Sequence, residues 1–188
     1  VEYLKLEKIT HVIDATHPFA SQMSKNAIEA CSIASIPLAA LTRPAWQSKK
    51  EDKWINVPNL EAAVQYLKQP KKRVLLAIGR QNLSLFYAQP QHSYILRLVD
   101  PPERPLKFPD HSINISRGPF TVKNDIALFK KYKIELVVAK NSGGRGASSK
   151  IEVARNLGVS VVMVDRPEIP SRKEIIQADA ALNWLNQV

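Results

Sequence analysis

The segment Val74-Leu75-Leu76-Ala77-Ile78-Gly79-Arg80-Gln81 decides the fold class of this chain. It begins with a continuous apolar run, which is typical of a strand that is buried on both faces of a parallel sheet. Gly79 then permits a close approach of the backbone, and Arg80 places a permanent positive charge where the strand ends. The segment therefore predicts an α/β protein with a candidate site beyond this strand.

Strands and helices alternate along the rest of the chain, which predicts parallel α/β architecture. The apolar patterns predict strands at 12–13, 37–41, 55–57, 74–78, 94–99, 136–139 and, as the last one, 161–164. They predict helices at 18–34, 60–67, 122–132, 148–157 and 173–186. The polar, unpatterned stretch 47–53 marks the expected boundary, with residues 1–48 in a first domain and residues 49–188 in a second.

The turn Asp14-Ala15-Thr16-His17-Pro18-Phe19-Ala20 follows the first predicted strand. Ligands of open parallel sheets bind at the carboxyl ends of the strands, so Thr16 and His17 are candidate binding residues. Pro18 is expected to open the helix that follows. Two alternatives are that Asp14 and Thr16 only cap this helix, and that His17 makes one local hydrogen bond.

The glycine-rich stretch Lys140-Asn141-Ser142-Gly143-Gly144 follows another predicted strand and precedes a helix. Its glycines free the backbone to point N–H groups at an anion, while Lys140 and the helix N-terminus add positive potential. The spacing is neither that of a Walker loop nor that of the Rossmann fingerprint. The alternative is a flexible surface loop.

Two further arginines lie beside predicted strands or helices. Arg43 follows the strand 37–41, and Arg117 stands in Arg117-Gly118-Pro119-Phe120 before the helix 122–132. Each guanidinium suits bidentate capture of a carboxylate or phosphate, and each is otherwise a solvated turn residue. Trp46 and Trp54 are interpreted as packing residues.

The net charge of +10 favours an anionic partner. The basic residues are dispersed and no recognition motif accompanies them, so an anionic small molecule is expected rather than a nucleic acid, with solubility alone as the alternative. A single cysteine excludes an internal disulfide, and the histidines are not spaced as metal ligands. No apolar run has membrane-spanning length and no signal peptide is visible, so a cytoplasmic protein without membrane partners is expected.

Several of these segments together resemble the precorrin-6A reductase family of cobalamin biosynthesis. The matching segments are collinear and span nearly the whole chain: Asp14–Ala20, Arg43–Trp46, Leu76–Gln81, Arg97 with Asp100–Pro102, Arg117–Phe120 and Lys140–Gly144. The resemblance implies two Rossmann-like parallel-sheet halves flanking a cleft. Family members open with a glycine-rich strand–turn–helix, which this chain lacks at Val1-Glu2-Tyr3-Leu4, so the chain is expected to be a fragment.

The resemblance also implies the chemistry, which is hydride transfer from NADPH, or NADH, to a precorrin-6A-type tetrapyrrole rich in carboxylates. It assigns to the cofactor Thr16, His17, Lys140, Asn141, Ser142, Gly143 and Gly144. It assigns to the substrate carboxylates Arg43, Arg80 and Arg117. No nucleophilic side chain is required, and the catalytic residue and oligomeric state stay unassigned. The alternative function is a non-catalytic nucleotide- or anion-binding α/β module.

Overall fold

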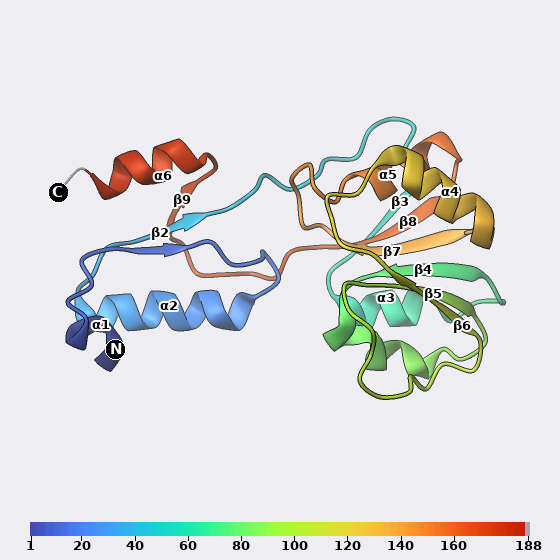
Figure 1. Cartoon of the computed structure of the whole chain (residues 1–188), viewed down its shortest axis with the longest axis horizontal. Helices are drawn as coiled ribbons and strands as arrows, with labels where there is room; N and C mark the ends of the chain where they lie inside the picture. Colours follow the sequence, from blue (N-terminus) through green and yellow to red (C-terminus); the bar gives the residue numbers. More distant parts are fainter. Residues whose placement is uncertain (187–188) are drawn as a thin grey trace. The chain divides into compact units, whose positions relative to one another are not determined.

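The computed structural model describes residues 1–186, which form two compact units (Figure 1). One unit contains residues 1–44 together with the residues from 167 onward, and the other contains residues 45–166. Each unit is built around a parallel sheet, which confirms the predicted α/β class with two parallel-sheet halves. No helix within residues 1–186 is both long and apolar enough to cross a membrane.

The first unit holds a sheet with the strand order β1-β2-β9. Its strands are β1 (Val12–Asp14), β2 (Leu38–Leu41) and β9 (Lys173–Ile175), and its helices are α1 (Glu2–Leu6), α2 (Ser21–Ala34) and α6 (Ala178–Leu185). Both pairings are parallel, with Ile13 opposite Ala39 and Ala40 opposite Glu174. A small core of Ala39, Ile175 and Ala181 joins the sheet to α6.

The return of the chain to the first unit was not expected from the sequence. Residues 173–175 were predicted as the start of the helix 173–186, and the second domain was predicted to run from 49 to 188. In the structure these residues are β9, which pairs with β2, and the backbone N–H of Thr42 donates to the carbonyl of Ile175 at 2.9 Å. The pattern of three residues is too short to distinguish a strand from a helix.

Pro18 does not open the helix, contrary to the prediction. Residues 18 and 19 form a turn, and α2 begins at Ser21. The turn is closed by the backbone N–H of Ala20, which donates to the carbonyl of His17 at 2.7 Å. This tight closure takes up the residues that the sequence pattern assigned to the first helical turn.

The second unit, residues 45–166, holds a sheet of 6 strands in the order β3-β8-β7-β4-β5-β6, all of them parallel. The strands are β3 (Trp54–Val57), β4 (Arg73–Ala77), β5 (Ser93–Leu98), β6 (His111–Ile115), β7 (Leu136–Lys140) and β8 (Ser160–Val164). The helices are α3 (Leu60–Tyr66), the 3-10 helix η1 (Arg80–Ala88), α4 (Val122–Tyr132) and α5 (Ser149–Asn156). In Figure 1, α3 and η1 lie on one face of this sheet and α4 and α5 on the other.

Most of these elements match the predictions, and the exceptions have physical reasons. The predicted helix 122–132 is α4, where the Thr121 side chain accepts from the backbone N–H of Asn124 and so caps the first turn. Strand β6 was missed because it is the outermost strand, carries polar side chains and has no fully buried residue. η1 was missed because its residues have no clear helical apolar period.

Candidate functional site

The sheet of the second unit reverses its strand order between β4 and β7. From β4 the chain adds β5 and then β6 on one side, and it then crosses back to place β7 and β8 on the other side. Such a reversal leaves a crevice outside the carboxyl ends of the two central strands, which is where open α/β sheets bind ligands. The turn after β4 contains Gly79 and Arg80, and the turn after β7 is the glycine-rich loop. The topology therefore brings both predicted turns to the same edge of the sheet.

The glycine-rich loop has the backbone conformation that its glycines make possible. Gly143 and Gly144 have φ values of +67° and +73°, a region that residues with a side chain rarely adopt. Asn141 and Ser142 are buried, and Lys140 is partly buried where β7 ends. Because burial disfavours its charged form, the pKa of Lys140 is lowered.

Trp46 anchors this loop through its backbone and its indole ring. The side-chain oxygen of Asn141 accepts from the backbone N–H of Trp46 at 2.8 Å, and the amide of Asn141 donates to the Trp46 carbonyl at 3.0 Å. The indole Nε1 of Trp46 donates to the carbonyl of Gly144 at 2.8 Å. The side chain of Asn141 thus holds the chain at Trp46, and the predicted packing role of Trp46 is only part of what it does.

Arg166, beyond the end of the neighbouring strand β8, binds the backbone of the loop. It follows β8, and its Nε and Nη2 donate to the carbonyls of Asn141 and Ser142 at 3.0 and 3.2 Å. Carbonyl groups at the start of the loop therefore point toward a guanidinium.

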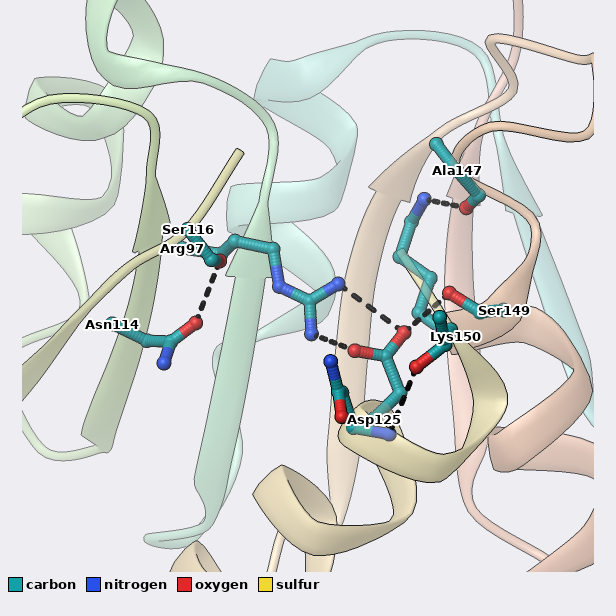
Figure 2. A network of polar contacts seen from close by, with 9 residues as sticks. Arg97, Asn114, Ser116, Asp125, Ala147, Ser149 and Lys150 are labelled. Carbon is teal, nitrogen blue, oxygen red and sulfur yellow. Dashed lines mark hydrogen bonds and ion pairs between the residues drawn. The ribbon is translucent and has the colours of Figure 1, made fainter. Parts of the chain in front are cut away.

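Beneath the loop lies a buried polar network, shown in Figure 2. Asp125 of α4 accepts from the Arg97 guanidinium of β5 at 2.5 and 3.3 Å, and from the Ser149 hydroxyl at 2.6 Å. The Arg97 guanidinium also lies 4.7 Å from the centre of the Phe120 ring, and the Phe120 N–H donates to the carbonyl of Gly146. The network therefore links β5, α4 and α5 to the segment 117–120 and to the end of the loop.

Lys150 is the most deeply buried amine of this network. Its Nζ donates to the carbonyl of Ala147 at 2.6 Å and lies 4.7 Å from the centre of the Trp46 ring. Burial lowers the pKa of Lys150 to about 7, with Arg97 acting in the same direction and Asp125 against it. An amine buried beneath a glycine-rich loop at the strand-order reversal is a candidate functional group.

The predicted substrate arginines lie on exposed turns. Arg80 pairs with Glu103 at 3.0 Å and Arg117 pairs with Asp100 at 3.3 Å, and both pairs are open to solvent. Both arginines follow strands of the second unit, β4 and β6, so they share its carboxyl edge with the glycine-rich loop. Arg43 belongs to the first unit, where it is exposed beyond the end of β2.

In the first unit the turn after β1 is organised by Asp14. Its carboxylate accepts from the Thr16 N–H at 3.0 Å, from the Thr16 hydroxyl at 2.6 Å and from the Ser24 hydroxyl of α2 at 2.6 Å. The Nδ1 of His17 accepts from the Phe19 N–H at 3.2 Å, and both Thr16 and His17 are exposed. Asp14 therefore reaches the helix through the Ser24 side chain.

Arg172 places a positive charge behind this turn. It precedes β9, its side chain is buried, and its Nη1 lies 3.4 Å from the Asp14 carboxylate. Burial of Asp14 favours its neutral form, but the hydrogen bonds from Ser24 and Thr16 and the charge of Arg172 outweigh that effect and lower the pKa of Asp14. Among residues 1–186, no group of His, Cys, Asp and Glu is arranged to hold a metal ion.

Sequence reasoning missed the buried charges that support these turns. Arg97 was named only as part of the family resemblance, without a role. The residues not named at all are Asp125, Lys150, Arg166 and Arg172, together with the neutral Ser149. One signal was available, because Arg97 interrupts the apolar strand β5, and a charge inside a buried strand requires a partner. The identity of that partner, Asp125, depends on the packing of α4 against the sheet.

The comparisons with known proteins agree with one another. The family model for precorrin-6x reductase CbiJ/CobK matches residues 1–186. A precorrin-6A reductase of Rhodobacter capsulatus is 50% identical over 98% of this chain and 74% of its own length. A cobalt-precorrin-6A reductase of Priestia megaterium is 32% identical over 89% of this chain and 69% of its own length.

A solved structure gives the same result. The structure of a CobK precorrin-6A reductase superposes with a TM-score of 0.96, at 50% identity, over 98% of this chain and 76% of that protein. The chain belongs to the precorrin-6x reductase family, whose members are oxidoreductases of cobalamin biosynthesis. The match with reductases favours the enzyme over the non-catalytic binding module.

Proposed function

We propose that this chain, as a member of the precorrin-6x reductase family, reduces a precorrin-6A-type tetrapyrrole by hydride transfer from NADPH or NADH. The observation that carries the proposal is the glycine-rich loop at the strand-order reversal of the second unit. A bound nicotinamide supplies the hydride, so the task of the protein is to align the reactants and to exclude competing reactions.

The residues of the loop fit the phosphates of a dinucleotide. Gly143 and Gly144 allow backbone N–H groups to turn toward an anion, and Lys140 adds a cation where β7 ends. The neighbouring turn leaves room for a ligand, because a Cβ added at Gly79 would meet no atom of residues 1–186 within 4 Å. The donor set therefore suits an anionic cofactor.

We assign the cofactor roles as follows. Lys140 and the backbone N–H groups of Gly143 and Gly144 bind phosphate. The N–H groups of Asn141 and Ser142 donate to the carbonyls of Val164 and Lys140, so these two residues shape the loop, with the Asn141 side chain fixing its backbone through Trp46. In the first unit, Thr16 and His17 are exposed at the end of β1 and are proposed as further cofactor contacts. Asp14 orients that turn by accepting from both the N–H and the hydroxyl of Thr16.

The carboxylates of the tetrapyrrole are assigned to Arg43, Arg80 and Arg117. The pairs that Arg80 and Arg117 make with Glu103 and Asp100 are solvent-exposed, and such pairs stabilise a protein by about 0–1 kcal/mol. A substrate carboxylate therefore replaces the acidic partner at little cost. A guanidinium also binds a carboxylate through two parallel hydrogen bonds, which favours arginine at these positions.

Titration calorimetry with NADPH and with NADH tests the cofactor, and the loss of reduced-nicotinamide absorbance on addition of precorrin-6A tests the reaction. We expect heat of binding with at least one nucleotide and oxidation only when the tetrapyrrole is present. Absence of binding to both nucleotides at about millimolar concentration, the weak end of specific affinity, overturns the proposal.

A further inference from the structure

We propose that Trp46 and Lys150 are positioning residues that hold the glycine-rich loop, residues 140–144, and the segment 145–147 that follows it in the shape that receives the cofactor phosphates. This inference rests on the proposed function, because it assumes that the loop binds the dinucleotide. Neither residue is asked to touch the cofactor or the substrate.

The loop needs such a support because its glycines make it costly to order. A glycine loses more conformational freedom on folding than any other residue, and Gly143 and Gly144 are adjacent. Trp46 bonds to the loop at two places, at Asn141 through its backbone and at Gly144 through its indole nitrogen. The backbone of Trp46 holds the start of the loop and its indole ring holds Gly144, so one residue fixes both sides of the intervening segment.

Lys150 contacts the segment that follows the glycines, at Ala147. Its Nζ is hydrogen-bonded to the carbonyl of Ala147 and lies over the face of the Trp46 ring. A cation over an indole face is attracted by the electrons of the ring, and the attraction grows when water is excluded. Trp46 and Lys150 therefore form one stack that contacts the loop at Asn141 and Gly144 and the segment after it at Ala147.

The burial of Lys150 is explained by this role and not by stability. The charge of Arg97 disfavours protonation of Lys150 and that of Asp125 favours it, but Asp125 is already paired with Arg97. A buried ammonium group is costly even when it is paired. Replacing Lys150 by methionine should therefore make the fold more stable at neutral pH and the loop less ordered. Opposite effects on global stability and on the loop distinguish a positioning residue from a merely structural one.

Cleavage by trypsin can report on the order of this segment, because Arg145 is exposed and trypsin cleaves after arginine. Cleavage after Arg145 in the ligand-free protein, followed by mass spectrometry, reports how often the loop opens. We expect Trp46→Phe, which keeps a ring but loses the bond to Gly144, to speed this cleavage about fivefold, the factor for one neutral hydrogen bond. We expect Lys150→Met to speed it about tenfold, because a charge-assisted bond is lost.

Trp54→Phe is the matched control. Trp54 is a second, partly buried tryptophan of the same unit, and its indole nitrogen finds no hydrogen-bond acceptor among residues 1–186. Its replacement should leave cleavage after Arg145 unchanged. Equal cleavage rates in wild type, Trp46→Phe and Lys150→Met overturn the inference.

Affinities for NADPH and NADH, measured by calorimetry, separate this inference from the proposed function. We expect Trp46→Phe to weaken nucleotide binding about fivefold and Lys150→Met about tenfold, the same factors by which they speed cleavage. Lys140→Ala should weaken nucleotide binding without speeding cleavage. If Lys140→Ala weakens binding while the other two variants do not, the positioning role is wrong and the proposed cofactor site stands. If none of the variants changes nucleotide affinity, the proposed cofactor site is wrong, and the positioning role falls with it.

Discussion

Lys150→Met should change how the stability of the protein depends on pH. In the unfolded chain the pKa of this lysine returns to 10.5, whereas burial lowers it to about 7 in the folded protein. Between these values the unfolded state binds a proton that the folded state does not, so the free energy of unfolding rises with pH. Below about pH 7 both states bind the proton, and the penalty for burying the charge is fully present.

The magnitude follows from the two pKa values. Integrating the difference in bound protons from about pH 7 to about pH 9.5 gives a gain of about 3 kcal/mol for the wild-type protein. Without the amine this contribution vanishes. The Lys150→Met protein should be the more stable of the two at about pH 7, and the difference should shrink toward about pH 9.5.

Urea unfolding, followed by tryptophan fluorescence at several pH values, measures this contribution. Lys123→Met is the control, because Lys123 is an exposed lysine on α4 and its replacement should leave the pH dependence unchanged. Parallel stability curves for wild type and Lys150→Met would refute the argument, because they would show that Lys150 takes up its proton equally in both states.

Three further results are expected. Lys140→Ala should weaken nucleotide binding by about 1.5–3 kcal/mol, the range of a charge-assisted hydrogen bond, as measured by calorimetry. Unchanged affinity would show that the loop is a surface segment that does not bind the nucleotide. Arg80→Lys and Arg117→Lys keep the charge but lose the bidentate geometry, so steady-state kinetics should show a larger rise in KM for the tetrapyrrole than for the nucleotide. The opposite pattern would assign both arginines to the cofactor. Asp14→Asn should destabilise the first unit by about 3 kcal/mol, since it removes the nearer and buried carboxylate of Arg172 and leaves only the exposed Glu174 at 4.0 Å, and a thermal melt equal to that of wild type would exclude this role.

The sequence predicted most of the strands because their chemistry is local. The runs Val74–Ile78, Leu136–Ala139 and Val161–Val164 are apolar without interruption, which is typical of a strand buried on both faces. β9 and β6 lack such a continuous apolar run, and both were missed. β9 is too short to show a period, and β6 is an outer strand whose pairing with β5 decides its conformation.

The candidate site was predictable only in its exposed part. Glycines and basic residues at the end of a strand are visible in the sequence, which is why the loop 140–144 and the turn at Arg80 were selected. The support beneath the loop depends on partners that are distant in the chain. Asn141 bonds to a residue 95 positions away, and Arg97 pairs with a residue 28 positions away. No spacing rule connects such residues, because the packing of the helices on the sheet brings them together.

The charges buried beneath the loop connect its stability to its function. Arg97 pairs with Asp125 in a buried region, where electrostatic interactions are stronger than at the surface, and the charges of both residues act on the buried amine of Lys150. When Lys150 is protonated the balance of charge beneath the loop is positive, and the loop leads to the N-terminus of α5, where the helix dipole has the same sign. A stable fold gains nothing from this arrangement, since hydrophobic side chains of the same size would pack there without the desolvation penalty. The proposed binding of an anion above the loop would make the arrangement favourable, because the anion attracts Arg97 and the protonated form of Lys150.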